Sequence, residues 1–189
     1  MLTKKEVEDF IVKFPIYQYA FLTPEDIDFS PKVRSFCRRD CRFYDTNWAC
    51  PPAVPRVEKC RLRCSQYSNV LFFSSVGSIG EGTKEARDES KQGHEDLVKI
   101  IEDHLINNGY RIYTLTSDTC TLCPKCTFPH EYCRHPELMH PCIESHGIVI
   151  SDLAVKFNMD YNISSRLHLW FALVFYEEAA EAAEGKADR

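Results

Sequence analysis

The segment CTLCPKCTFPHEYC, residues 120–133, places four cysteines within fourteen residues. Their spacing is C-x2-C-x2-C-x6-C, and they are Cys120, Cys123, Cys126 and Cys133. Thiols this close together serve disulfides, zinc or an iron–sulfur cluster. A C-x2-C turn directs two thiolates at one centre, a third cysteine extends the wrap, and a fourth after a longer loop completes tetrahedral ligation. The spacing therefore fits a metal centre.

The even spacing of the first three cysteines bears on which metal would bind. Bacterial ferredoxins use C-x2-C-x2-C runs to hold iron–sulfur clusters. Zinc sites more often offer two separated C-x2-C or Cys/His pairs. Three evenly spaced cysteines crowd one side of a small zinc ion, whereas a broader cubane accommodates them. We expect one [4Fe–4S] cluster on this run, with zinc as the alternative.

Other possible donors lie close to the run. Four histidines are near it in sequence: His130, His135, His140 and His146. The simpler interpretation places them at the surface or beside the ligands, because the cysteines alone supply four donors. The other interpretation makes one of them a ligand or a proton donor. Cys142 is either a spare ligand or a buried free thiol.

A second group of cysteines, Cys37, Cys41 and Cys50, lies in FCRRDCRFYDTNWACPP. Proline cannot donate an amide hydrogen bond and turns the chain away from the preceding Cys50. A Cys-Pro pair is also common at cluster ligands. These three residues are the predicted core of a second metal site. Cys60 and Cys64 share one helical face at C-x3-C spacing, and they either complete that site or pack as small apolar residues.

The first cysteine region is strongly basic. Residues 32–64 carry nine Lys or Arg and three Asp or Glu, a net charge of +6 in a chain whose net charge is −5. Nearby cations stabilise thiolates and raise the potential of a cluster. The patch would suit docking of an acidic redox partner such as a ferredoxin, or it is a solvated basic face. Nucleic acid is not expected, because the whole chain is acidic and shows no recognition module.

The start of the chain, MLTKKEVEDFIVKF, bears on the cellular compartment because charges interrupt every apolar run. It lacks the apolar stretch of a signal peptide, and no segment approaches the ~20 apolar residues that cross a bilayer. Helical spacing instead predicts a surface helix over residues 4–14, with Thr3 and Glu6 as a capping box. We expect a cytoplasmic protein without membrane contact, in which clustered cysteines serve metal or redox chemistry rather than disulfides.

The elements that must position these cysteines follow from hydrophobic patterns. VLFFSSV (70–76), a long helix over 84–108 and RIYTLTS (111–117) form a predicted βαβ unit. LHLWFALVFY (167–176) is apolar on both faces and reads as a central strand. The expected fold class is α/β, with α+β as the alternative: a small mixed sheet, packed helices and two cysteine-rich loops. Residues 1–176 are the expected single domain, with cysteine regions 37–64 and 120–142 and a charged tail over 177–189.

Two motifs, taken together, resemble a known family. The first is C-x3-C-x2-Y-x3-W-x-C-P-P, from Cys37 to Pro52. The second is C-x2-C-x2-C…C-R-H-P, from Cys120 to Pro136, followed by Glu144 and Gly147-Ile148. In this order they are similar to domain-of-unknown-function family 2284, and the likeness extends over residues 15–176. That family is described as predicted metal-binding proteins, mainly of anaerobic bacteria and archaea.

The resemblance implies metal binding through both cysteine groups and supplies no reaction. Position 142 is commonly serine in the family, which argues against Cys142 as a required ligand. Cys60 and Cys64 also lie outside the shared pattern, which weakens them as ligands. The family's metal-binding cysteines correspond in this chain to Cys50, Cys120, Cys123, Cys126 and Cys133.

The sequence as a whole predicts a cysteine-rich metal-binding protein. The leading hypothesis is a [4Fe–4S] protein with an electron-transfer or redox role in anaerobic metabolism. The alternative is a zinc-stabilised binding module without redox activity. A third hypothesis is an enzyme whose metal activates a small substrate. Its pocket would be lined by Tyr44, Trp48, His130 and His135.

Overall fold

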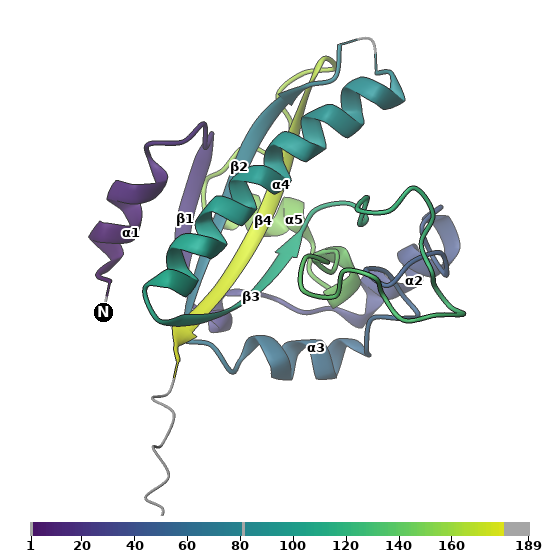
Figure 1. Ribbon diagram of the computed structural model, residues 1–189, viewed down its shortest axis with the longest axis horizontal. Coiled ribbons are helices and arrows are strands. Elements are labelled where there is room, and N and C mark those ends of the chain that lie inside the picture. Colours follow the sequence, from purple (N-terminus) through teal and green to yellow (C-terminus); the bar gives the residue numbers. More distant parts are fainter. Residues whose placement is uncertain (1, 81, 180–189) are drawn as a thin grey trace, which may run out of the picture.

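A computed structural model describes residues 2–80 and 82–179 (Figure 1). Its strands are β1 (Gln18–Leu22), β2 (Asn69–Ser78), β3 (Tyr110–Thr116) and β4 (Leu167–Glu178). Its α-helices are α1 (Lys4–Ile11), α2 (Pro31–Asp40), α3 (Val57–Cys64), α4 (Lys84–Asn107) and α5 (Ile150–Lys156), and two short 3-10 helices are η1 (Pro24–Asp26) and η2 (Glu144–His146). No helix in the described ranges is long and apolar enough to cross a membrane.

The four strands form one sheet in the order β1-β2-β4-β3. Every neighbouring pair is antiparallel. β2 and β3 run in the same direction, because each is antiparallel to β4 between them. The α/β class and the strand–helix–strand unit are confirmed. The expected mixed sheet is corrected in its pairing, because the last strand inserts between the two strands that α4 connects, as in a split βαβ unit.

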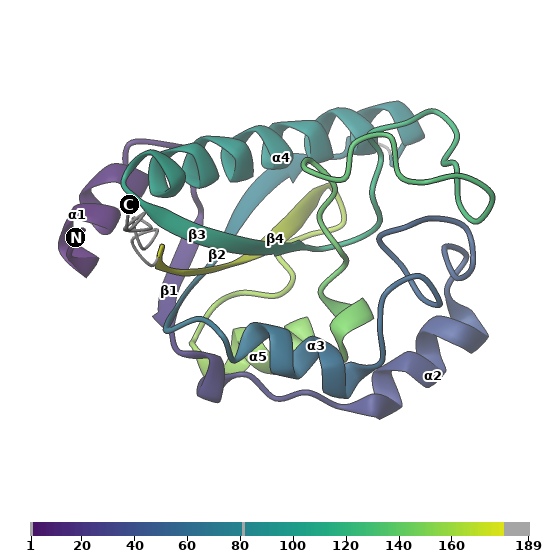
Figure 2. The ribbon, with the colours of Figure 1, turned by 60° about the horizontal axis from the view of Figure 1, so that its bottom comes forward.

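β4 is buried on both faces, as its sequence predicts. Phe171 and Phe175 belong to one apolar core, and Ala172 and Val174 belong to the other. Helices α1 and α4 cover the second core, whereas α3 and α5 cover the first (Figure 2). The sheet is therefore the middle of three layers, and the two cysteine-rich segments lie at the end of the sheet where β3 finishes (Figure 2).

The ends of the chain differ slightly from the predicted boundaries. The capping box is present, since Thr3 Oγ1 accepts from the Glu6 amide at 3.2 Å and the Glu6 carboxylate accepts from the Thr3 amide at 2.7 Å. α1 ends at Ile11, earlier than the predicted 4–14. β4 continues to Glu178, which pairs with Tyr110, so the predicted tail begins inside the sheet. Residues 180–189 of that tail lie outside the described residues.

β2 contains a glycine where α4 crosses the sheet. A Cβ at Gly77 would lie 1.5 Å from Ser90 Oγ and 2.7 Å from Ser90 Cβ. Ser90 lies on α4 and accepts a hydrogen bond from Trp170 Nε1 of β4 at 2.7 Å. This close approach fixes the first half of α4, the part nearest the cysteine-rich segments, on the sheet.

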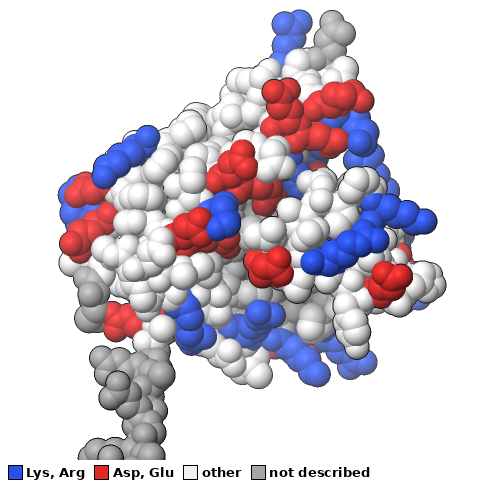
Figure 3. All heavy atoms as spheres, in the orientation of Figure 1, with Lys and Arg blue, Asp and Glu red and all other residues white. Residues whose placement is uncertain are grey.

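Charge is unevenly spread over the surface. Figure 3 shows Lys and Arg along the lower edge of the molecule, over α3, and many Asp and Glu over α4. The exposed basic residues of α2 and α3 are Lys32, Arg38, Arg39, Lys59, Arg61 and Arg63. The basic region expected from the sequence is therefore a solvent-facing surface.

Candidate metal centre

The second cysteine run lies in the irregular segment between β3 and η2. Its four predicted ligands line one small cavity, together with Trp48 from the first cysteine region. All ten cysteines of the chain lie in the described residues and are free thiols. The structure thus brings together Cys120, Cys123, Cys126 and Cys133.

The cavity at these four thiols is narrow. Its volume is about 20 Å³, which is room for about one water-sized body. Within residues 2–80 and 82–179, no group of three His, Cys, Asp or Glu side chains is arranged to hold a metal ion as it stands. A cluster would therefore need the loop to widen and the thiols to turn inward. The four cysteines are half-buried and lie outside any helix or strand.

Trp48 connects the two cysteine regions. Its ring packs edge to face against Phe128 of the second run, with ring centroids 5.1 Å apart. Trp48 Nε1 is buried and has no hydrogen-bond partner. A buried indole N–H normally finds an acceptor, and the sulfurs of a thiolate-held cluster accept such bonds. An orphaned donor beside four thiols fits an anionic sulfur centre at this place.

One face of α4 anchors the start of the cysteine loop. Arg87, Lys91 and Glu95 recur at every fourth residue and so share that face. Arg87 Nη2 lies 2.9 Å from Asp118 Oδ2, and Lys91 Nζ donates to the carbonyl of Thr119. Lys91 is itself paired with Glu95, 3.4 Å from its Oε1. The two residues that precede Cys120 are therefore held in place.

His140 ties the far end of the loop to the same helix. Its Nδ1 lies 3.0 Å from Glu95 Oε2, and its Nε2 lies 3.0 Å from Glu102 Oε1. Burial alone would lower the pKa of His140, but the bonds to Glu102 and Glu95 raise that pKa to about 9. Burial alone would raise the pKa of Glu95, but His140 and Lys91 hold that pKa at about 2. With both ring nitrogens engaged, His140 is a structural cation and not a metal ligand.

The remaining histidines are either beside the thiols, as a ligand or proton donor would be, or away from them. His135 lines the cavity of the second run, as Trp48 does. His130 is exposed and lines neither cysteine cavity. His146 is buried, with Nε2 2.6 Å from Tyr113 Oη, and burial lowers the pKa of His146 to about 3. Of the four histidines, His135 alone lies beside the thiols.

The first cysteine group lines a second and larger cavity of about 460 Å³. α2 carries Cys37 in its last turn, and the amide of Cys41 donates to the Cys37 carbonyl at 3.3 Å. Cys50 is buried, and its Sγ donates to Thr119 Oγ1 at 3.5 Å. These three predicted ligands therefore share one cavity, and Tyr44 lies in its wall.

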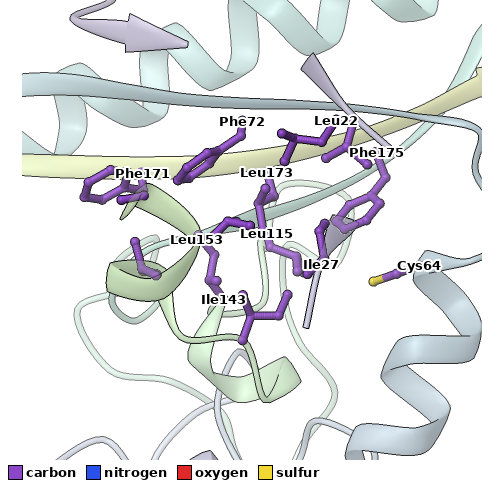
Figure 4. Close-up of a cluster of buried hydrophobic side chains, with 14 of the residues drawn as sticks. Leu22, Ile27, Cys64, Phe72, Leu115, Ile143, Leu153, Phe171, Leu173 and Phe175 are labelled. Carbon is purple, nitrogen blue, oxygen red and sulfur yellow. The ribbon is translucent and has the colours of Figure 1, made fainter. Parts of the chain in front are cut away.

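Cys60 and Cys64 lie away from this cavity. Their face of α3 turns towards the core between the helix and the sheet, where Cys64 is fully buried (Figure 4). Burial raises the pKa of Cys64 to about 12. Cys60 Sγ donates to the carbonyl of Pro55 at 3.3 Å. The structure favours the interpretation that both pack as small apolar residues.

Cys142 is a member of the larger cavity that the sequence did not assign. It pairs with Thr116 at the end of β3, and its amide donates to the carbonyl of Ala49 at 3.1 Å. Ala49 directly precedes Cys50, so the two cysteines lie side by side. Cys142 Sγ donates to Glu144 Oε2 at 2.7 Å. No local spacing indicates this contact, because it depends on the path of the chain after β3.

The comparison with protein families decides the relationship of this chain. A model of the DUF2284 family, described as predicted metal-binding proteins, matches residues 20–176. The chain belongs to this family. No curated protein and no solved structure matches it.

In this DUF2284 protein the donor set itself indicates the kind of metal. Thiolates are soft ligands that favour zinc, copper(I) and iron–sulfur clusters. Burial is the main cause that raises the pKa of Cys37, Cys50 and Cys120, so these thiols stay protonated until a cation binds. Metal binding must therefore release protons. Free thiols of this kind line two separate cavities.

Proposed function

We propose that this DUF2284 protein holds a [4Fe–4S] cluster on its second cysteine run and exchanges electrons with an acidic partner protein. A bound cluster of this kind supplies reversible one-electron transfer. The observation that carries the proposal is the shared cavity, which is lined both by four free thiols at C-x2-C-x2-C-x6-C spacing and by Trp48, whose indole N–H has no partner. The ligands would be Cys120, Cys123, Cys126 and Cys133.

The four proposed ligands differ in how firmly the fold holds them. Asp118 and Thr119 are held by α4, so Cys120 is the fixed ligand. The other three cysteines follow on an irregular loop that can close around a cluster. The loop is also near solvent, since Leu122 is 42% exposed and Tyr132 is 92% exposed. A redox partner can therefore approach closely without a change in the core.

The basic surface of α2 and α3 supports an acidic partner. Arg38 and Arg61 are exposed there, next to the exposed apolar side chains of Phe36 and Leu62, which are 59% and 65% exposed. Aromatic and apolar contacts ringed by charge are typical of interfaces. Opposite charge on a partner raises the rate of encounter. Because α2 also carries Cys37, this surface adjoins the cysteine regions.

Metal analysis of anaerobically purified protein tests the proposal. We expect a brown protein with acid-labile sulfide and an electron paramagnetic resonance signal after reduction. The variants Cys123→Ala and Cys126→Ala should each lose about four irons per chain relative to the parent, as a cubane requires. Cys60→Ser is the matched control, because Cys60 lies outside both cavities. A colourless protein whose second run holds one zinc would overturn the proposal.

A further inference from the structure

Four thiols from three separate segments meet in the larger cavity. α2 and the residue after it give Cys37 and Cys41, the turn before Pro51 gives Cys50, and the segment after the second run gives Cys142. Cys50 is buried in the cavity wall, and Cys142 Sγ donates to Glu144 Oε2, another lining group, at 2.7 Å.

Backbone hydrogen bonds hold Cys50 and Cys142 beside each other. The amide of Cys142 donates to the carbonyl of Ala49 at 3.1 Å. On either side of it, the Ile143 amide donates to the Thr116 carbonyl at 3.0 Å, and the Thr116 amide donates to the Pro141 carbonyl at 3.2 Å. The position of Cys142 beside Cys50 is thus set by the end of β3, not by a flexible loop.

A tight packing contact holds the remaining pair. The amide of Ser30, which caps α2, donates to the carbonyl of Gly147 at 2.7 Å. A Cβ at Gly147 would lie 2.9 Å from the Ser30 carbonyl and 2.8 Å from Val57 Cγ1, and its φ is +84°. Glycine therefore allows η2 to pack against the start of α2. This contact fixes the helix that carries Cys37 relative to the segment that carries Cys142.

The size of the cavity favours a cluster over a single ion. Its volume is about 460 Å³, whereas a water molecule occupies about 30 Å³ of liquid. Apolar side chains of Val33, Phe36 and Phe43 form part of its wall. Asp40, Asp118 and Glu144 also line it. Among the described residues no three His, Cys, Asp or Glu side chains are arranged to hold a single ion, so four thiols around a space of this size suit a group of several metal and sulfide ions rather than one ion.

We infer that a second iron–sulfur cluster binds in this cavity, with Cys142 as the fourth ligand beside Cys37, Cys41 and Cys50. When a preformed cluster that carries four small thiolate ligands is supplied, each protein thiol loses its S–H bond and gains an S–Fe bond, while one Fe–S bond to a small thiolate breaks. The four displaced thiolates leave with the four protons as free thiols, and no electron changes hands in that step. The inference goes beyond the proposed function, since it concerns a separate cavity and a separate set of ligands.

Iron counting with matched variants tests this site. The full-length protein is loaded anaerobically with a preformed, thiolate-ligated [4Fe–4S] cluster, and iron, sulfide and the reduced-state paramagnetic resonance spectrum are measured. The parent should hold about eight irons per chain, and Cys50→Ala and Cys142→Ala should each hold about four. Cys60→Ser should match the parent. Retention of the second-run cluster signal in Cys142→Ala shows that this variant is folded.

The outcomes separate the two proposals. Unchanged iron in both Cys50→Ala and Cys142→Ala, with iron lost from Cys123→Ala, overturns the second site and leaves the proposed function standing. Iron lost from Cys50→Ala but not from Cys123→Ala supports the second site and overturns the proposed function. If the parent holds one zinc per chain at this site in place of iron, and Cys142→Ala loses that zinc, the cluster assignment in this cavity is overturned.

Discussion

Replacing Trp48 with phenylalanine tests the orphaned donor beside the second cysteine run. The substitution removes the indole N–H and keeps an aromatic ring against Phe128, whose centroid lies 5.1 Å away. Trp48 Nε1 is buried and lacks a partner, and such a donor costs about 1–3 kcal/mol. In the metal-free protein, removal of the unpaired donor stabilises the fold, and this gain offsets the packing energy lost with the smaller phenylalanine ring. We expect the free energy of unfolding to change by less than about 1 kcal/mol.

The other tryptophan provides a matched control. Trp170 is fully buried, and its Nε1 donates to Ser90 Oγ at 2.7 Å. Trp170→Phe removes the same ring volume and also breaks a satisfied hydrogen bond worth about 1 kcal/mol. In urea unfolding of the metal-free protein, Trp170→Phe should therefore be the more destabilising substitution, by about 2 kcal/mol.

The cluster-loaded protein gives the second measurement. A hydrogen bond to a charged acceptor contributes about 1.5–3 kcal/mol. If about 1 kcal/mol of this favours the more negative reduced state, the potential shifts by about 40 mV, at about 59 mV per 1.4 kcal/mol. Trp48→Phe should lower the midpoint potential by that amount without loss of iron, and Trp170→Phe should leave it unchanged. Potentiometric titration followed by paramagnetic resonance measures both.

Two results would refute this reasoning. A midpoint potential of Trp48→Phe within about 10 mV of the parent means that the indole N–H does not reach the cluster sulfurs. Equal destabilisation of the metal-free protein by Trp48→Phe and Trp170→Phe means that Trp48 already has an acceptor in the protein.

Three further predictions concern the scaffold and the partner. Gly77→Ala should destabilise the fold by about 1–3 kcal/mol in urea unfolding, because the new methyl group displaces Ser90. Glu95→Gln should lower the free energy of unfolding by at most about 3 kcal/mol at neutral pH. The pKa of Glu95 is about 2 in the fold and 4.5 ordinarily. The difference in free energy of unfolding between variant and parent should therefore shrink as the pH falls from 4.5 to 2. Arg38→Glu with Arg61→Glu should slow electron exchange with an acidic ferredoxin about tenfold at low salt in stopped-flow mixing, and an effect that persists at high salt would contradict charge steering.

The elements of the fold could be predicted because their signals are local. Alternating or continuous apolar runs predicted β2, β3 and β4, and the 3.6-residue period predicted α4. The strand order could not be predicted in the same way. β4 pairs with β2 although the two are far apart in the sequence, as in Val70 with Phe175, and no local pattern shows which two strands a central strand will lie between. The correction of the mixed sheet to an antiparallel one has this origin.

In the candidate site, too, local contacts could be predicted from the sequence and long-range contacts could not. The second run could be grouped from its spacing, because short loops keep neighbouring cysteines together. The helical spacing of Cys60 and Cys64 correctly placed them on one face of α3, but spacing does not tell whether that face meets a metal or the core. No spacing assigned Cys142 to the first group. Its place beside Cys50 comes from its own hydrogen bond to Ala49 and from the bonds that Pro141 and Ile143 make with Thr116.

The two cavities meet at Thr119 and Cys120, so the two cysteine regions are joined through neighbouring residues. Thr119 lines the larger cavity and accepts the hydrogen bond of Cys50 Sγ, whereas Cys120, the next residue, lines the smaller one. An electron that passed between the two proposed centres would have a short covalent and hydrogen-bonded path through Cys50 Sγ, Thr119 and Cys120. Lys91 holds the carbonyl of Thr119, so one helix positions both sets of ligands. Two independent metal loops would respond separately to a change in α4, whereas a change that moves Thr119 should affect both proposed centres together.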